Sequence, residues 1–175
     1  MMVNKNVVFL MIFAILSGCN DVENLLKFNI NDQTSFTIQN TSLLNVPLEI
    51  PTPDVTSNSQ QQYENNRTHV NLVKDVRLEQ LKLSITNPVS KKFSFLKSIR
   101  IFISSDQTTE LELAKLENIP ADVSTVLLIP TKENLDKYIK ASSYNLRTEV
   151  ITRETLTESV DILVDLKFQL TADTF

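Results

Sequence analysis

The last strand-like segment of the chain limits its fold most strongly. In the stretch ESVDILVDLKFQLTA, every second residue from 160 to 170 is apolar: Val160, Ile162, Val164, Leu166, Phe168 and Leu170. Successive side chains of a β-strand point to opposite faces, so these residues share one face. Because such a face cannot remain in water, it must line a core. The other face, with Asp161, Asp165 and Lys167, is expected to be solvated.

Shorter segments with the same period precede it. Apolar alternation covers residues 26–30, 35–38, 76–85, 93–103, 111–113, 123–129 and 146–151. Asn31 to Gln33 is expected to turn between the first two strands, since Asn and Asp tolerate left-handed conformations. A phase slip around Glu79-Gln80 predicts a β-bulge. Asn87-Pro88 is expected to end that strand.

Three segments depart from simple alternation. Residues 43–55 contain prolines at 47, 51 and 53, which limits them to an edge strand or an extended connection. The polar residues 56–68 are expected to form a loop. In TKENLDKYIKA, residues 131–141, the spacing of Leu135, Tyr138 and Ile139 indicates a helix of about ten residues, with Thr131 as N-cap.

Seven to nine strands with one short late helix predict a mainly β fold. We expect an antiparallel, immunoglobulin-like β-sandwich, with a half-open β-barrel as the alternative. A parallel α/β sheet would need a helix between most strands, which the sequence does not provide. Residues 26–175 are therefore expected to form a single domain, with a polar loop near 56–68.

The N-terminal residues have the pattern of a secretory signal. Lys5 supplies a positive charge, Val7 to Leu16 form an apolar run of ten residues, and small residues follow. Ten residues of helix rise about 15 Å, roughly half of the ~30 Å hydrocarbon core of a bilayer. The run is therefore too short to span a membrane, and residues 1–18 are expected to be a signal peptide.

The four residues Leu16-Ser17-Gly18-Cys19 resemble the lipobox of bacterial lipoproteins. This resemblance implies cleavage after Gly18, a diacylglyceryl thioether on Cys19, a further acyl chain on the new amino group, and a tether of residues 19–25. Two or three acyl chains hold a protein at a membrane, whereas one binds only marginally. The resemblance implies a location in the bacterial cell envelope, at the outer membrane, periplasmic or surface-exposed. The alternative is a core cysteine behind an ordinary signal peptide.

Two further resemblances involve the strands. The segments FSFLKSIRIFIS, DKYIKASSYNLRTEVITRETLT and VDILVDLKFQLTAD look like uncharacterised lipoproteins of Bacteroidetes-type bacteria. LKLSITNPVSKKF, together with Ile119-Pro120, is similar to the water-stress (WHy) domain of late embryogenesis abundant proteins. That second resemblance implies a β-sandwich that protects or binds.

Missing residue types exclude several chemistries. Removal of Gly18 leaves no glycine, which excludes a P-loop, a dinucleotide fingerprint, a nucleophile elbow and a standard EF-hand loop. With its only cysteine, Cys19, expected to carry the lipid, the chain has no free cysteine and one histidine, His69, so it cannot form a His/Cys zinc site or a Cys-His dyad. The formal charge of −4 has the wrong sign for general nucleic-acid binding, and no basic cluster is longer than Lys91-Lys92. No catalytic residue, metal or cofactor is predicted.

The remaining candidate groups are carboxylates and tyrosines. Glu158, Asp161 and Asp165 could bind calcium or act as acid and base; the alternative is a solvated face that discourages edge pairing.

Tyr63, Tyr138 and Tyr144 could stack on sugars, but the chain has no tryptophan, and Tyr138 is more simply explained by helix packing. Asn66-Arg67-Thr68 matches a glycosylation sequon, whose use a bacterial signal peptide argues against.

Two functions remain open. We favour a non-enzymatic structural or interaction module, held at the membrane through Cys19 and using a sheet edge or loops to meet a protein partner. The alternative is a hydrolase of carbohydrate or peptide that works with carboxylates alone. The missing glycine and cysteine and the single histidine favour the first function.

Overall fold

The computed structural model describes residues 26–106 and 108–173. The predicted signal peptide and the lipobox-like motif, including Cys19, lie outside the described residues. Within the described part, no helix is long and apolar enough to cross a membrane.

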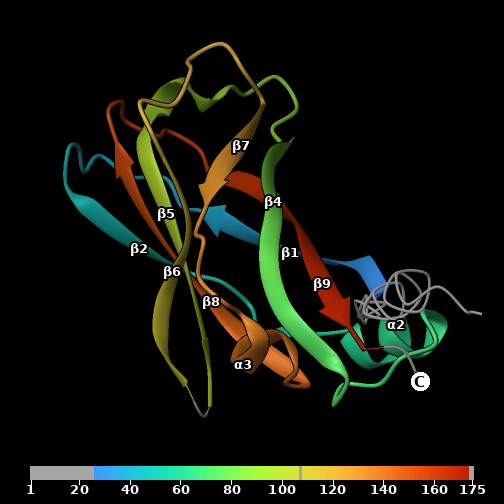
Figure 1. Ribbon diagram of the computed structural model, residues 1–175. Helices are drawn as coiled ribbons and strands as arrows, with labels where there is room; N and C mark the ends of the chain where they lie inside the picture. The colour runs from blue at the N-terminus through green and yellow to red at the C-terminus, as the bar shows by residue number, and fades with distance from the viewer. Residues whose placement is uncertain (1–25, 107, 174–175) are drawn as a thin grey trace, which may run out of the picture.

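The described residues form a nine-stranded antiparallel sheet that curls into a half-barrel (Figure 1). The strand order is β1-β9-β4-β7-β6-β5-β8-β2, and β3 pairs with β8 beside β2. The predicted mainly β, antiparallel fold is thus confirmed, and the curled sheet is compatible with both the sandwich and the half-open barrel.

The strands are β1 (Leu26–Ile38), β2 (Pro47–Pro51), β3 (Val55–Thr56), β4 (Val73–Asn87), β5 (Leu96–Ser105), β6 (Thr108–Glu117), β7 (Thr125–Pro130), β8 (Ser143–Thr152) and β9 (Val160–Ala172). Two short α-helices, α2 (Ser59–Asn65) and α3 (Asp136–Ile139), and a 3-10 turn, η2 (Phe93–Phe95), complete the described elements. Both α-helices lie at the lower end of the half-barrel in Figure 1, the end that also holds the C-terminus.

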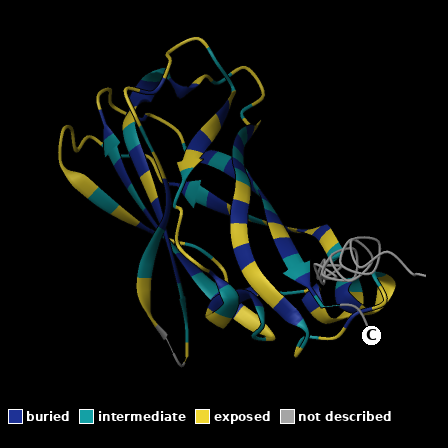
Figure 2. Ribbon diagram, viewed as in Figure 1, coloured by how far each residue is buried: buried dark blue, intermediate teal, exposed yellow. Residues whose placement is uncertain are grey.

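Strand β9 provides the longest buried face of the sheet. All six predicted inward residues from Val160 to Leu170 are at most 1% exposed, which confirms the assignment of the faces. β9 pairs with β1 on one side and with β4 on the other, and the bands of burial along β4 and β9 alternate in Figure 2. The register shift between Leu78 and Gln80 on β4 confirms the predicted bulge.

The turn predicted at Asn31 to Gln33 is wrong. β1 runs without a break from Leu26 to Ile38 and pairs with β9 along its whole length. The inward positions of β1 include Ile30, Asp32 and Phe36, and the carboxyl of Asp32 is buried like its apolar neighbours. A polar residue at an inward position therefore looked like a turn in the sequence.

The late helix is shorter than predicted. α3 covers only Asp136–Ile139, because the residues before it bond to strands: Thr131 N donates to Leu113 O at 2.8 Å and Leu135 N to Val76 O at 2.8 Å. Thr131 does not cap the helix; its hydroxyl accepts from Glu133 N at 3.3 Å.

The polar segment 56–68 also differs from the prediction of a loop, because it contains α2. Ser59 and Tyr63, four residues apart, form the buried side of this helix. The prolines of residues 43–55 do limit that segment to an edge, since β2 ends the strand order.

The two faces of β9 can be compared through adjacent residues. We expect Val164→Asp to lower the free energy of unfolding by on the order of 4 kcal/mol, because it buries a charge without a partner. Asp165→Ala removes a half-exposed ion pair and should cost about 0.5 kcal/mol. Urea unfolding followed by circular dichroism measures both values, and a larger loss for Asp165→Ala would show that the faces are reversed.

Candidate functional site

The half-barrel stops short of closing along one line. Cα atoms of β1 come within 8 Å of those of β2 and β3. In the described residues, however, no ladder joins β1 to either strand, and the strand that pairs with β1 is β9. We call the space between β1 and residues 55–58 the seam. Side chains, rather than main-chain hydrogen bonds, hold its two sides together.

The first bridge across the seam joins β8 to β1. Tyr144 donates its hydroxyl to Oδ2 of Asp32 at 2.9 Å, and the two residues are 1% and 6% exposed. Burial and the nearby Asp32 carboxylate raise the pKa of Tyr144, so its hydroxyl stays protonated and able to donate. The Tyr144 ring also packs edge-on against Phe168, with 6.3 Å between ring centroids.

The carboxyl of Asp32 is only partly satisfied by this contact. Desolvation by burial raises its pKa, and the hydrogen bond from Tyr144 and the nearby main-chain N–H of Asn58 offset only part of that rise. Its Oδ1 atom is buried and makes no hydrogen bond of ordinary geometry with the described residues. Such a group is costly to bury.

The second bridge joins α2 to the free edge of β1. Asn31 N donates to Oε1 of Gln62 at 3.0 Å, and Nε2 of Gln62 donates back to Asn31 O at 3.3 Å. The side-chain amide of Gln62 thus bonds the strand as a peptide group of a neighbouring strand would. The helix is held there by Tyr63, which contacts Phe28 edge-on and donates to Ile139 O at 3.3 Å.

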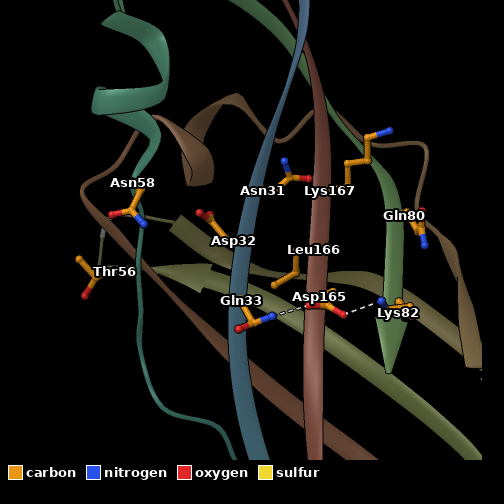
Figure 3. A pocket seen from close by; sticks show the side chains of 10 residues that line it. All are labelled: Asn31, Asp32, Gln33, Thr56, Asn58, Gln80, Lys82, Asp165, Leu166 and Lys167. Carbon is orange, nitrogen blue, oxygen red and sulfur yellow. Dashed lines mark hydrogen bonds and ion pairs between the residues drawn. The ribbon is translucent and has the colours of Figure 1, made fainter. Parts of the chain in front are cut away.

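A cleft of about 550 Å³ lies beside these bridges and extends over the outer face of β9 and β4. We call it the seam cleft. Its polar lining includes four side-chain amides, those of Asn31, Gln33, Asn58 and Gln80. In Figure 3 the Asp32 side chain points from β1 toward the lip that carries Thr56 and Asn58.

On the outer face, Asp165 is held by two neighbours. Gln33 Nε2 donates to its Oδ1 at 2.6 Å, and Lys82 Nζ lies 2.9 Å from its Oδ2 (Figure 3). Partial burial alone would raise the pKa of Asp165, but the hydrogen bonds from Gln33 and Lys82 bring it below the ordinary value. Asp165 is therefore an ionised, paired carboxylate.

Asp32 and Asp165 line one cleft from opposite faces of the sheet. Asp32 pairs with Leu166 in the β1–β9 ladder, whereas Asp165 pairs with Gln33. Adjacent positions along a strand point to opposite faces, so the two carboxyls do not flank a common position.

The other predicted carboxylates stand apart from them. Asp161 accepts from Thr37 Oγ1 at 2.7 Å and from Asn87 Nδ2 at 3.2 Å, and Glu158 is exposed in the connection before β9. Among the described residues, no group of three His, Cys, Asp or Glu side chains could hold a metal ion.

The three tyrosines do not form a sugar platform. Tyr63, Tyr138 and Tyr144 are 1%, 7% and 1% exposed. Each donates its hydroxyl inside the protein, and that of Tyr138 reaches Thr109 O at 2.8 Å, in keeping with its expected role in helix packing.

His69 is exposed in the turn after α2, where it lines a smaller cavity of about 290 Å³ with Lys140 and others. In the sequon, the Thr68 side chain is buried.

The sequence analysis did not predict a second polar cluster, which lies on the outer face of β5 and β8. Phe102 makes cation–π contacts with Arg100 and Arg147, whose Cζ atoms lie 5.0 and 4.1 Å from the ring centroid. Arg147 also pairs with Glu110 at 2.7 Å, and Arg100 with Glu112 at 2.5 Å. Both arginines are thus bound to carboxylates, so the cluster stabilises the sheet. Alternating arginine and glutamate on adjacent strands is the signal that would have indicated it.

Comparison with known proteins gives little to set beside this geometry. No family model matches the chain, and no curated protein matches it. One solved structure with detectable similarity is titled Desmodium yellow mottle tymovirus. It is 13% identical over 86% of this chain and 90% of that chain, with a TM-score of 0.27. A likeness at that level supports no conclusion about function.

The partly satisfied Asp32 makes stability depend on pH. Its pKa in the folded protein lies above the ordinary value of 3.8, so the folded state holds the proton more tightly than the unfolded state. The stabilisation this gives is present at low pH and is lost as pH rises through the folded pKa, at about 1.4 kcal/mol for each unit of pKa difference. Asp32→Asn keeps an acceptor for Tyr144 but cannot ionise, so it should melt above wild type near neutral pH.

Thermal melts from neutral pH down to the ordinary aspartate pKa test this expectation. The advantage of Asp32→Asn should shrink as pH falls, because wild-type Asp32 becomes protonated. Asp161→Asn, at a half-exposed position outside the seam, is the matched control. A melting temperature of Asp32→Asn that stays below wild type at neutral pH would contradict the prediction.

Proposed function

We propose that this protein is a lipid-anchored protein of the bacterial cell envelope that acts as a non-enzymatic binding module, and that the seam cleft holds an extended segment of a protein partner. The observation that carries the proposal is the reciprocal pair of hydrogen bonds between Asn31 and Gln62. At this point the main-chain N–H and C=O of Asn31, on the edge of β1, both hydrogen-bond to the side-chain amide of Gln62.

Several features of the cleft fit an extended peptide. Side-chain amides offer donors and acceptors together, as peptide groups do, and four of them line the cleft. β1 is an edge strand of 13 residues without proline. The opposite edge, β2, has five residues and carries Pro47 and Pro51 at its ends. Proline blocks main-chain pairing, so β1 is the edge better able to receive a partner.

The lipobox would place this cleft close to a membrane. Leu26 follows Cys19 by seven positions in the sequence, and seven steps of the chain span at most about 25 Å in any conformation. Asn31 lies five residues into β1, about 17 Å further along the strand. The proposed partner therefore lies in or near the same membrane.

A carboxylate-based hydrolase has less support. Its two carboxyls would have to face one substrate, but Asp32 and Asp165 lie on opposite faces of the β1–β9 ladder. Asp165 is also paired with Lys82.

Lipid attachment is tested through Cys19. Cys19→Ala should abolish metabolic labelling with palmitate and release the protein from the membrane fraction, because no thiol remains to accept the lipid. Ser17→Ala keeps a small residue in the lipobox and should label normally. Continued labelling of Cys19→Ala would exclude lipidation at this position.

Binding in the cleft is tested by site-specific photocrosslinking in intact cells. A photoreactive residue should capture the same partner protein from Ser35, which is exposed on β1, and from Thr56, on the opposite lip of the cleft. The control position is Glu117, exposed on β6 and distant in strand order from both edges. Equal capture of that protein from all three positions, or from Glu117 alone, would contradict the assignment of the cleft.

A further inference from the structure

The Asp32 carboxyl lies at the inner side of the seam cleft with one oxygen satisfied and the other not. Tyr144 donates to Oδ2, whereas the buried Oδ1 makes no hydrogen bond of ordinary geometry among the described residues and has only the main-chain N–H of Asn58 nearby. A ligand made only of main-chain amides has no need of a negative charge at this place. The carboxyl therefore points to a more particular requirement of the partner.

No cation of the described chain serves this carboxyl. The two lysines that line the cleft are on its outer face, and each forms an ion pair with another carboxylate. Lys82 pairs with Asp165 at 2.9 Å and Lys167 with Glu79 at 3.0 Å. No ion pair in the described residues includes Asp32. A buried carboxylate becomes favourable when a hydrogen-bonding cation pairs with it, so a cation from outside would find its site here.

The lip beside Asp32 allows such a cation to enter. Thr56 and Asn58 are exposed, and the Asn58 side chain makes no capping hydrogen bond to α2. Figure 3 shows both side chains opposite Asp32 across the gap. Asp32, Thr56 and Asn58 all line the cleft, so a cation would approach the carboxyl from this side. A cleft of about 550 Å³ is ample for one long side chain.

We propose that the seam cleft selects a basic residue of the partner's extended segment, whose ammonium or guanidinium group donates to Oδ1 of Asp32 while Tyr144 holds Oδ2. This inference rests on the proposed function, which it narrows to a basic partner segment. The net charge of the chain, −4, has the matching sign. A hydrogen bond from a lysine or arginine to a carboxylate is also roughly twice as strong as one between neutral groups.

The probe for this site is n-butylammonium, which carries the end of a lysine side chain. Asp32 and Tyr144 are followed by NMR, through the side-chain carboxyl carbon and the ring signals. Butylammonium should shift both sets of signals saturably and should lower the pH at which Asp32 titrates, because the cation favours the ionised carboxyl. Uncharged n-butanol, of matched length, should do neither.

Variants assign the effect to one carboxyl. Asp32→Asn should lose the saturable shift of the Tyr144 signals, and a thermal melt verifies that this variant is folded. Asp161→Asn removes a carboxylate that does not line the cleft, and should keep the shift.

Three results would overturn the inference. They are the absence of any saturable shift, an equal shift with n-butanol, and loss of the shift in Asp165→Asn but not in Asp32→Asn. The last result would place the cation on the outer face of β9.

The photocrosslinking result separates this inference from the proposed function. If one partner is captured from Ser35 and Thr56 but butylammonium has no effect, the proposed basic residue is contradicted and the proposed binding module stands. If butylammonium has the expected effect but no partner is captured, the cation site is supported and the proposed protein partner is contradicted.

Discussion

Main-chain groups at the edge of a curled sheet need partners wherever the ladder does not close. Here side chains supply them. Gln62 of α2 bonds both main-chain groups of Asn31 on β1, and Asp136 of α3 accepts from Val76 N on β4 at 2.7 Å. The two helices are too short to be stable alone. They depend on buried contacts, among which Tyr63 of α2 donates to Ile139 O of α3.

The shortage of glycine shapes the connections between these elements. Four described non-glycine residues have positive φ: Asn45 at 57°, Arg67 at 54°, Asp75 at 46° and Asn118 at 53°. Asparagine and aspartate tolerate this conformation, because their short polar side chains bond locally, whereas arginine gains no such relief. Arg67 lies directly after α2, so the helix that covers the β1 edge also leads into a strained turn. The contact between α2 and the edge of β1 is therefore expected to open more readily than the strand pairs of the sheet.

Local periodicity was enough to predict β9 and the bulge of β4, and the prolines were enough to predict the edge position of β2, because each depends on neighbours in sequence. It failed at β1, where Asp32 occupies an inward position, and at α3, whose preceding residues are bound to Val76 and Leu113. The cleft was beyond prediction, since Gln33, Asp165 and Lys82 meet only because β9 lies between β1 and β4. The resemblance to a lipobox could be stated from the sequence because Leu16 to Cys19 are continuous, and lipid attachment there remains a prediction.

The seam combines a line where no ladder joins the two sides of the sheet with a buried carboxyl that is only partly satisfied. A complete ladder between β1 and β3 would satisfy the edge and exclude ligands, while an apolar residue in place of Asp32 would remove the desolvation cost. The chain has neither, and Tyr144 instead holds the carboxyl in one orientation at 2.9 Å. A ligand that pairs with Asp32 and with the edge of β1 would satisfy both groups together. Its binding would therefore stabilise the folded protein through the contacts that the unbound seam lacks.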